Sequence, residues 1–179
     1  MFHRSRRLLL RPIWPEDWQA LMAGIADEGV ARNLALAPWP YQEGDARAFA
    51  ARPVEPLFPR FLITRAQDAQ VIGCIGIEPA GTPGAVTLGC WIARRFWGQG
   101  YATEAGEAVL SVAEMLGHGE AEAWHFLDNP ASGKVLRKLG FEPTGRVEER
   151  WSRARGGKAP SAHYRRDLAA MPTEHQRAA

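Results

Sequence analysis

Two glycines that frame a single residue, Gly98 and Gly100, stand between a strand-like and a helix-like segment. Glycine allows unusual backbone dihedral angles and lets an oxygen atom come close to main-chain N–H groups. The first turn of a helix has unpaired N–H donors and a partial positive charge, which together favour a bound phosphate. Arg94 and Arg95 precede this turn and add positive charge. The segment therefore predicts a site for a diphosphate.

Two well-known phosphate sites do not fit this segment. In a dinucleotide fingerprint, Gly-x-Gly-x-x-Gly/Ala, the acidic residue that follows would be Glu120 or Glu122. However, Thr103 stands where the third glycine or alanine is required. Only about eighty residues follow, too few for the second half of a doubly wound sheet. A P-loop is excluded because no Gly-Lys-Ser/Thr follows the glycines.

A second segment with chemistry begins at Asn129. An asparagine followed by Pro130 has the form of a helix N-cap with proline at the first helical position. Ser132 then stands in the first turn, where a serine ordinarily bonds to the backbone. The five histidines never approach metal-ligand spacing with one another or with the two cysteines. The sequence therefore predicts a capped helix with a polar start and no metal site.

Composition limits the class of protein. The chain has 179 residues, 46% of them hydrophobic and 23% charged, with a net charge of +2, as expected for one globular domain. That balance argues against a general nucleic-acid binder. No stretch is long enough for a membrane helix or a signal peptide. Cys74 and Cys90 lie in strand-like surroundings outside any CxxC pair. We therefore expect a soluble cytoplasmic protein with reduced thiols and no membrane or nucleic-acid partner.

Hydrophobic periodicity predicts the elements that position these residues. Strands are expected over residues 8–10, 61–64, 71–77, 86–93, 121–126, 146–152 and 162–168. Helices are expected over residues 14–25, 28–36, 45–51, 101–116 and 130–139. The pattern predicts one α+β domain over residues 1–170, followed by a C-terminal tail over residues 171–179.

The residues from Trp97 to Ala105 resemble a known motif. They are similar to the coenzyme A pyrophosphate loop of the GNAT acyltransferase superfamily, Gln/Arg-x-x-Gly-x-Gly/Ala, with Trp97 in place of the first residue. The string is most similar to the RimJ/RimL-type branch. Residues 7–12 with Asp17, Pro40-Tyr41 and residues 129–141 resemble further segments of that branch, so the likeness spans residues 7–168.

The resemblance implies both a fold and an activity. The expected fold is a mixed, mostly antiparallel sheet of about seven strands, with helices on both faces and a V-shaped splay between two parallel central strands. The expected reaction is transfer of an acetyl group from acetyl-CoA to a primary amine, by direct attack in a ternary complex. The acceptor would be a protein N-terminal α-amine or a small-molecule amine. Many relatives pair, which leaves a homodimer open.

The resemblance also assigns roles to residues. It implies that the pantetheine arm pairs with the main chain of Cys90, Trp91 and Ile92 and that the pyrophosphate binds N–H groups of Gly98, Gln99, Gly100, Tyr101, Ala102 and Thr103. Asn129 would contact the cofactor arm, and Ser132 would lie near the thiol as the best candidate for the proton donor. Lys134, Arg137 and Lys138 form either a phosphate contact or a solvated basic face.

The sequence departs from the family at the acid and the base. Leu136 stands where many members have a tyrosine acid, and Trp124 stands where some have a glutamate base. No base is assigned. His125 is expected on the opposite face of its strand, and a water chain could reach one of the carboxylates Glu78, Glu148 and Glu149. A non-catalytic acyl-CoA-binding or regulatory module therefore remains the alternative function.

Overall fold

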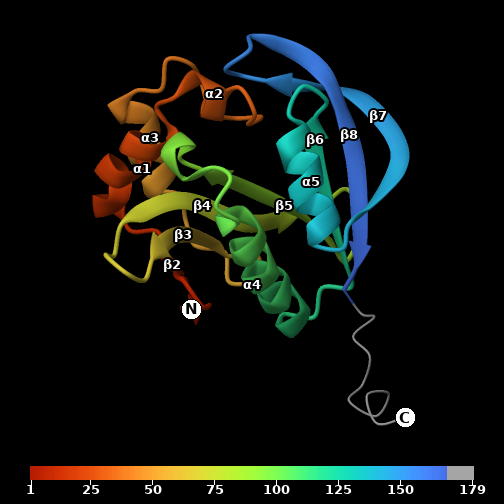
Figure 1. The fold of residues 1–179 in the computed structure, drawn as a ribbon, viewed down its shortest axis with the longest axis horizontal. Coiled ribbons are helices and arrows are strands. Elements are labelled where there is room, and N and C mark those ends of the chain that lie inside the picture. The colour runs from red at the N-terminus through yellow and green to blue at the C-terminus, as the bar shows by residue number, and fades with distance from the viewer. Residues whose placement is uncertain (169–179) are drawn as a thin grey trace.

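The computed structural model describes residues 1–168 of the chain, which form a single α+β domain (Figure 1). One eight-stranded sheet runs through it, in the order β1-β2-β3-β4-β5-β6-β8-β7. The strands are β1 (His3–Arg4), β2 (Leu8–Pro12), β3 (Arg60–Arg65), β4 (Val71–Pro79), β5 (Ala85–Ile92), β6 (Glu120–Phe126), β7 (Glu142–Ser152) and β8 (Gly157–Asp167). The helices are η1 (Pro15–Asp17), α1 (Trp18–Ile25), α2 (Glu28–Ala31), α3 (Glu43–Ala50), η2 (Arg94–Phe96), α4 (Tyr101–Met115) and α5 (Pro130–Lys138).

The central strands carry the core because helices cover both of their faces. In β4 the side chains from Ile72 to Ile77 are all buried, a pattern typical of a strand covered on both sides. Trp91 of β5 points toward α1, where a Cβ added to Gly24 would lie 2.8 Å from the indole. On the other face, α4 and α5 pack closely, since a Cβ at Gly106 would lie 2.5 Å from Leu139. A glycine at each contact lets these helices approach.

The sheet splits at its centre. Strands β5 and β6 are parallel and pair only from Ala85 to Thr87. Beyond that point β5 stays paired with β4 as far as Ile92, and β6 stays paired with β8 as far as Phe126. The expected V-shaped splay between two parallel central strands is therefore present, and all other strand pairs are antiparallel.

The predicted elements occur in the predicted order, with three differences. The helix predicted over residues 28–36 ends at Ala31, so α2 has only four residues. The two-residue β1 lies outside β2, which makes eight strands where about seven were expected. The last two strands each extend over 11 residues, longer than predicted. Strand β7 is an edge strand, and most of its residues are exposed on both faces, so its sequence shows little alternation. The predicted tail over residues 171–179 lies outside the described residues.

Candidate functional site

A cavity of about 350 Å³ occupies the gap between β5 and β6. Its walls come from the splayed strands, the loop before α4, the start of α4, α5 and the segment after α2. Leu88 and Ile75 form part of its apolar floor. The pocket thus lies where a ligand arm could replace the missing strand partner.

The loop before α4 presents a row of free N–H donors. None of the backbone N–H groups of residues 98–103 donates to another described residue. Gly98 and Gly100 have φ angles of 75° and 80°, a left-handed conformation that glycine adopts without strain. Successive N–H groups around left-handed residues form a concave anion site, and the α4 dipole adds to it. This loop fits a diphosphate.

Arg7 of the segment before β2 holds this loop from behind. Its guanidinium donates from Nε to Glu104 Oε2 at 2.7 Å and from Nη1 to the carbonyl of Gln99 at 3.1 Å. It also lies 4.5 Å from the centre of the Tyr101 ring. Ser5 Oγ and the Arg7 backbone N–H donate to Glu104 Oε1 at 2.7 and 2.6 Å. These bonds outweigh the burial that favours protonation, so the pKa of Glu104 is lowered.

The edge of β5 faces the cavity without a strand partner. Cys90, Trp91 and Ile92 all line the cavity, and the pairing with β6 has ended by this point. Trp97 Nε1 donates to the Ile92 carbonyl at 2.6 Å, so the residue that replaces the first motif position supports the strand. Burial raises the pKa of the Cys90 thiol to about 12, which keeps it protonated at neutral pH. A neutral thiol makes a poor nucleophile.

Asn129 and Ser132 form a small polar unit at the start of α5. Asn129 Oδ1 accepts from the backbone N–H of Ser132 at 3.4 Å, as expected for an N-cap. Asn129 Nδ2 donates to Ser132 Oγ at 2.9 Å. Because the serine oxygen accepts that bond, its own hydrogen is free to be donated into the cavity. Asn129 serves as the helix cap and orients the hydroxyl at the same time.

The structure brings nearly all of the predicted site residues to one cavity. The predicted residues that line it are Cys90, Trp91, Ile92, Gly98, Gly100, Tyr101, Ala102, Thr103, Asn129 and Ser132. Gln99 does not line it, because its side chain donates outward to the carbonyl of Arg95 at 3.2 Å.

Among the predicted basic residues, only two residues of α5 bring positive charge to the cavity. Lys134 and Lys138 line the cavity, on the side opposite β5. Arg137 lies 5.8 Å from the Tyr164 ring centre, and Arg94 lies 3.6 Å from the carboxylate of Asp27. Arg94 and Arg95 precede the loop but do not line the cavity. The predicted basic cluster is therefore only partly directed at the site.

Within residues 1–168, no Asp or Glu side chain lines the cavity. Trp124 and Leu136, the two departures from the family pattern, both line it. His125 Nδ1 contacts the carbonyl of Phe126 at 2.9 Å, and its ring packs against Gly133 of α5, on the face opposite Trp124. The other base candidates, Glu78, Glu148 and Glu149, are also absent from the lining.

Asn33 is a lining residue that the sequence did not single out. It follows α2 and reaches the cavity from the N-terminal third of the chain. Its Nδ2 donates to the carbonyl of Gly29 at 2.7 Å. An asparagine just after a four-residue helix has no distinguishing motif, so no local signal marks it.

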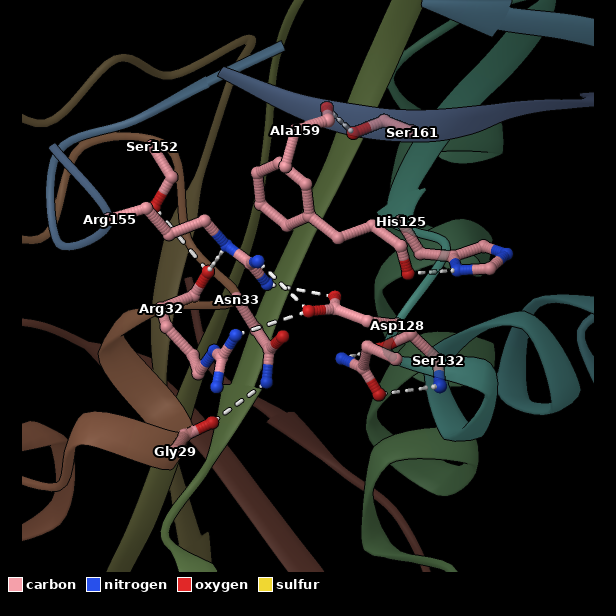
Figure 2. Close-up of polar contacts among 12 residues, drawn as sticks. Gly29, Arg32, Asn33, His125, Asp128, Ser132, Ser152, Arg155, Ala159 and Ser161 are labelled. Carbon is pink, nitrogen blue, oxygen red and sulfur yellow. Dashed lines mark hydrogen bonds and ion pairs between the residues drawn. The ribbon is translucent and has the colours of Figure 1, made fainter. Parts of the chain in front are cut away.

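Three charged residues join the segment after α2, the segment before α5 and the turn between β7 and β8 (Figure 2). Arg155, between β7 and β8, binds Asp128 through two hydrogen bonds of 2.9 and 2.8 Å. Arg32 Nη2 reaches the same carboxylate at 3.2 Å, and Arg155 Nε donates to the Arg32 carbonyl at 2.7 Å. We refer to Arg32, Asp128 and Arg155 as the clasp. The hydrogen bond from Arg155 lowers the pKa of Asp128.

Two classes of feature were searched for in the described part of the chain. No group of three or more His, Cys, Asp or Glu side chains within it could hold a metal ion. No helix among these residues is long and apolar enough to cross a membrane.

Comparisons with known proteins identify the family. The model of the acetyltransferase (GNAT) domain matches residues 7–142. The chain is 31% identical over 144 residues to the uncharacterized N-acetyltransferase YoaA of Bacillus subtilis, covering 78% of this chain and 81% of that protein.

Solved structures share the fold. A GNAT-family acetyltransferase from Bacillus anthracis superimposes with a TM-score of 0.82 at 20% identity, over 94% of this chain and 99% of that one. RimL, a ribosomal α-N-protein acetyltransferase in complex with coenzyme A, gives a TM-score of 0.77 at 19% identity, over 96% and 100%. The splayed strands, the loop of free N–H donors and the sequence match lead to one conclusion: this chain belongs to the family of GNAT-domain acetyltransferases.

Proposed function

We propose that this chain transfers an acetyl group from acetyl-CoA to a primary amine by direct attack in a ternary complex, and that it belongs to the RimJ/RimL-type branch. The acceptor is a protein N-terminal α-amine or the amine of a small molecule. One observation carries the proposal: β5 separates from β6 after Thr87, and the resulting cavity leads to six free N–H donors.

The residues present fit acetyl-CoA. The N–H groups of residues 98–103 would hold its diphosphate, with Lys134 and Lys138 adding positive charge. The free edge of β5 at Cys90 and Trp91 would hold the pantetheine arm. When bound, acetyl-CoA supplies the acetyl group as a thioester, whose C–S bond breaks as the C–N bond forms, so that the amide and free coenzyme A thiol result. RimL, a protein of the same fold, is known in complex with coenzyme A.

Ser132 is the proposed proton donor in this reaction. Asn129 Nδ2 donates to its oxygen at 2.9 Å, which leaves the Oγ–H free to protonate a leaving sulfur. The proton lost by the attacking nitrogen passes to solvent, from which the serine is reprotonated. A serine in this position takes the role that the family's tyrosine would have at Leu136.

The acceptor amine reacts as its free base drawn from solution. No carboxylate of the described residues lines the cavity, so the side chains offer no anionic base there. Holding a thioester and an amine in line supplies much of the rate acceleration, and a strong base is not obligatory. The proposal therefore expects the rate to rise with pH as more acceptor becomes unprotonated.

A non-catalytic acyl-CoA-binding or regulatory module is the second candidate. It is favoured by Leu136 and Trp124, which line the cavity where relatives have an acid and a base. Such a module would bind coenzyme A and would release no thiol with any acceptor.

One assay separates the two functions. The full chain is incubated with acetyl-CoA and a panel of hexapeptides with Ser, Ala or Met N-termini, together with spermidine, and the free thiol is followed. Thiol release that depends on an acceptor, with a sequential kinetic pattern, supports acetyl transfer. Cofactor binding in calorimetry without turnover on any acceptor supports the module.

We further propose that the protein acts in the cytoplasm. Cys74 and Cys90 are both free thiols, as expected in a reducing compartment. The proposed partners are the cofactor and the amine acceptor, without nucleic acid or membrane. A homodimer stays a prediction for measurement in solution.

A further inference from the structure

The end of the cavity that the N-terminal third of the chain lines has a distinctive composition. From the N-terminal third of the described chain, only Val30, Asn33 and Leu34 line the cavity. Two of these side chains are apolar. The amide of Asn33 is therefore the polar group that this third of the chain presents to a bound acceptor.

The orientation of the Asn33 amide is determined by chemistry. Its Nδ2 donates to the carbonyl of Gly29 at 2.7 Å, and a carbonyl can only accept. The amide nitrogen must therefore face Gly29, and Oδ1 must point the other way. Figure 2 shows this oxygen turned away from Gly29 toward the side on which Ser132 lies. No described residue donates to Oδ1.

The clasp fixes the position of Asn33 relative to Ser132. Arg32 precedes Asn33, and Asp128 immediately precedes the cap of α5. Arg155 binds Asp128 in a bidentate manner and also binds the carbonyl of Arg32 at 2.7 Å. Its side chain is 14% exposed and lies 4.4 Å from the Phe126 ring centre. The clasp therefore ties the two walls that carry Asn33 and Ser132.

The charges around this end disfavour an ammonium ion. The guanidinium groups of Arg150 and Arg146 lie 4.3 and 5.4 Å from the Trp124 ring centre. The charged groups near this end include Arg32, Asp128 and Arg155 of the clasp and Arg146, Glu148 and Arg150 of β7. They also include Glu122, which lies 3.4 Å from His163, whose ring centre is 4.4 Å from that of Trp124. Positive groups are in excess, and the carboxylates of Asp128 and Glu148 are both engaged by arginines.

We propose that Asn33 binds the acceptor amine, with its Oδ1 accepting an N–H of the neutral primary amine. An N–H directed at Asn33 leaves the nitrogen lone pair free for the thioester, across the cavity from Ser132. The amide oxygen carries no net charge, so it stabilises the unreactive ammonium form less than a carboxylate in the same place would. This inference rests on the proposed function and adds to it the residue that binds the nucleophile.

Two substitutions separate this role from a structural one. Asn33→Leu removes both the Oδ1 acceptor and the bond to Gly29. Asn33→Asp also removes the bond to Gly29 but keeps an acceptor oxygen in the same place. Ser152→Ala is the matched control, because Ser152 Oγ donates to the Leu34 carbonyl at 2.9 Å and anchors the same segment from outside the cavity.

The test uses the peptide or polyamine that the wild-type chain acetylates fastest, with kinetics from pH 6 to pH 10. In Asn33→Leu, kcat/KM for the acceptor is expected to fall about tenfold at every pH, as for loss of one hydrogen bond. The KM for acetyl-CoA stays within about twofold of wild type. In Asn33→Asp, kcat falls at neutral pH because the carboxylate keeps the acceptor amine protonated. The kcat recovers toward wild type near pH 10, where the amine loses its proton.

The outcomes are distinct. The inference is overturned if Asn33→Leu matches Ser152→Ala, or if Asn33→Asp remains as impaired as Asn33→Leu at pH 10. A loss that appears only in the KM for acetyl-CoA also overturns it. If the wild-type chain binds coenzyme A but acetylates no acceptor, the proposed function fails, and this inference fails with it.

Discussion

Arg7 and Glu104 join the beginning of the chain to the first turn of α4, 97 residues away, through a contact of 2.7 Å. The same guanidinium binds the Gln99 carbonyl at 3.1 Å. In a planar trans peptide the C=O and N–H point in opposite directions. Tethering the Gln99 carbonyl to Arg7 therefore directs the N–H of Gly100 away from Arg7, where the cavity lies. The pair sets the geometry of the proposed diphosphate site without touching a ligand itself.

The first prediction concerns Arg7 as a positioning residue. Arg7→Met should raise the KM for acetyl-CoA about tenfold, because the loop loses the bond that orients its N–H groups. The KM for S-acetylpantetheine, which lacks the diphosphate, should not change. Arg6→Met is the matched control, since Arg6 is exposed and makes no contact with Gln99. Equal losses with both acetyl donors would show that Arg7 has only a general structural role.

The second prediction concerns the pH dependence of stability. The pKa of Glu104 is lowered in the folded protein, so its charged form stabilises the fold above the unfolded pKa, and this stability is lost as pH falls through the folded pKa. Glu104→Gln should reduce the free energy of unfolding by about 2 kcal/mol at pH 7, as for hydrogen bonds to a charged group. Urea unfolding at several pH values should show the difference between wild type and variant shrinking below the ordinary pKa of 4.5. A difference that is constant with pH would contradict this account.

The third prediction tests Ser132 as the proton donor. Ser132→Ala should lower kcat at least about tenfold, because general acid catalysis is lost, while the backbone N–H that Asn129 caps is retained. Calorimetry should find nearly unchanged affinity for coenzyme A. Ser161→Ala serves as the control, since Ser161 Oγ donates to the Ala159 carbonyl at 3.3 Å and is absent from the cavity lining. If Ser132→Ala remained fully active, solvent rather than Ser132 would be the proton donor to the leaving sulfur.

The fourth prediction concerns the clasp. Arg155→Met should lower the free energy of unfolding by about 1 kcal/mol, because Asp128 loses two charged hydrogen bonds while its half-exposed carboxylate regains water. It should also raise the KM for the amine, since the walls that carry Asn33 and Ser132 separate. Arg165→Met is the comparison, because exposed Arg165 on β8 lies 3.5 Å from Glu120. If both variants had the same KM for the amine, the clasp would have no role in the acceptor end.

Much of the fold could be predicted from sequence because its signals are local. The buried strands β3, β4 and β5 have β-branched runs between turn residues, and α4 begins after two glycines in the conformation that the loop requires. The glycine loop and the N-cap of α5 were local signals, and the resemblance to the GNAT family implied the remaining cavity residues of β5 and α5. Strand β7 was predicted too short because an exposed edge strand has no buried face to impose alternation.

The proposed acceptor end could not be predicted because its contacts join distant parts of the chain. Arg32 and Asp128 are 96 residues apart, and Arg155 and Arg32 are 123 apart. Asn33 has no motif, and its role depends on where α2 places it relative to α5. The bond from Trp97 to the Ile92 carbonyl is local, but the family pattern at that position suggested only a missing polar residue. Side-chain direction, rather than residue type, determines these contacts.

The most direct test of the account is bisubstrate kinetics of the full chain with acetyl-CoA and the peptide and polyamine panel, following the free thiol and the mass of the acceptor. The account predicts that one thiol is released for each acetyl group, about 42 Da, added to the amine. It also predicts intersecting initial-velocity lines, because both substrates occupy the cavity together. Coenzyme A binding without a mass increase in any acceptor, or parallel lines from a covalent acetyl-enzyme, would contradict it.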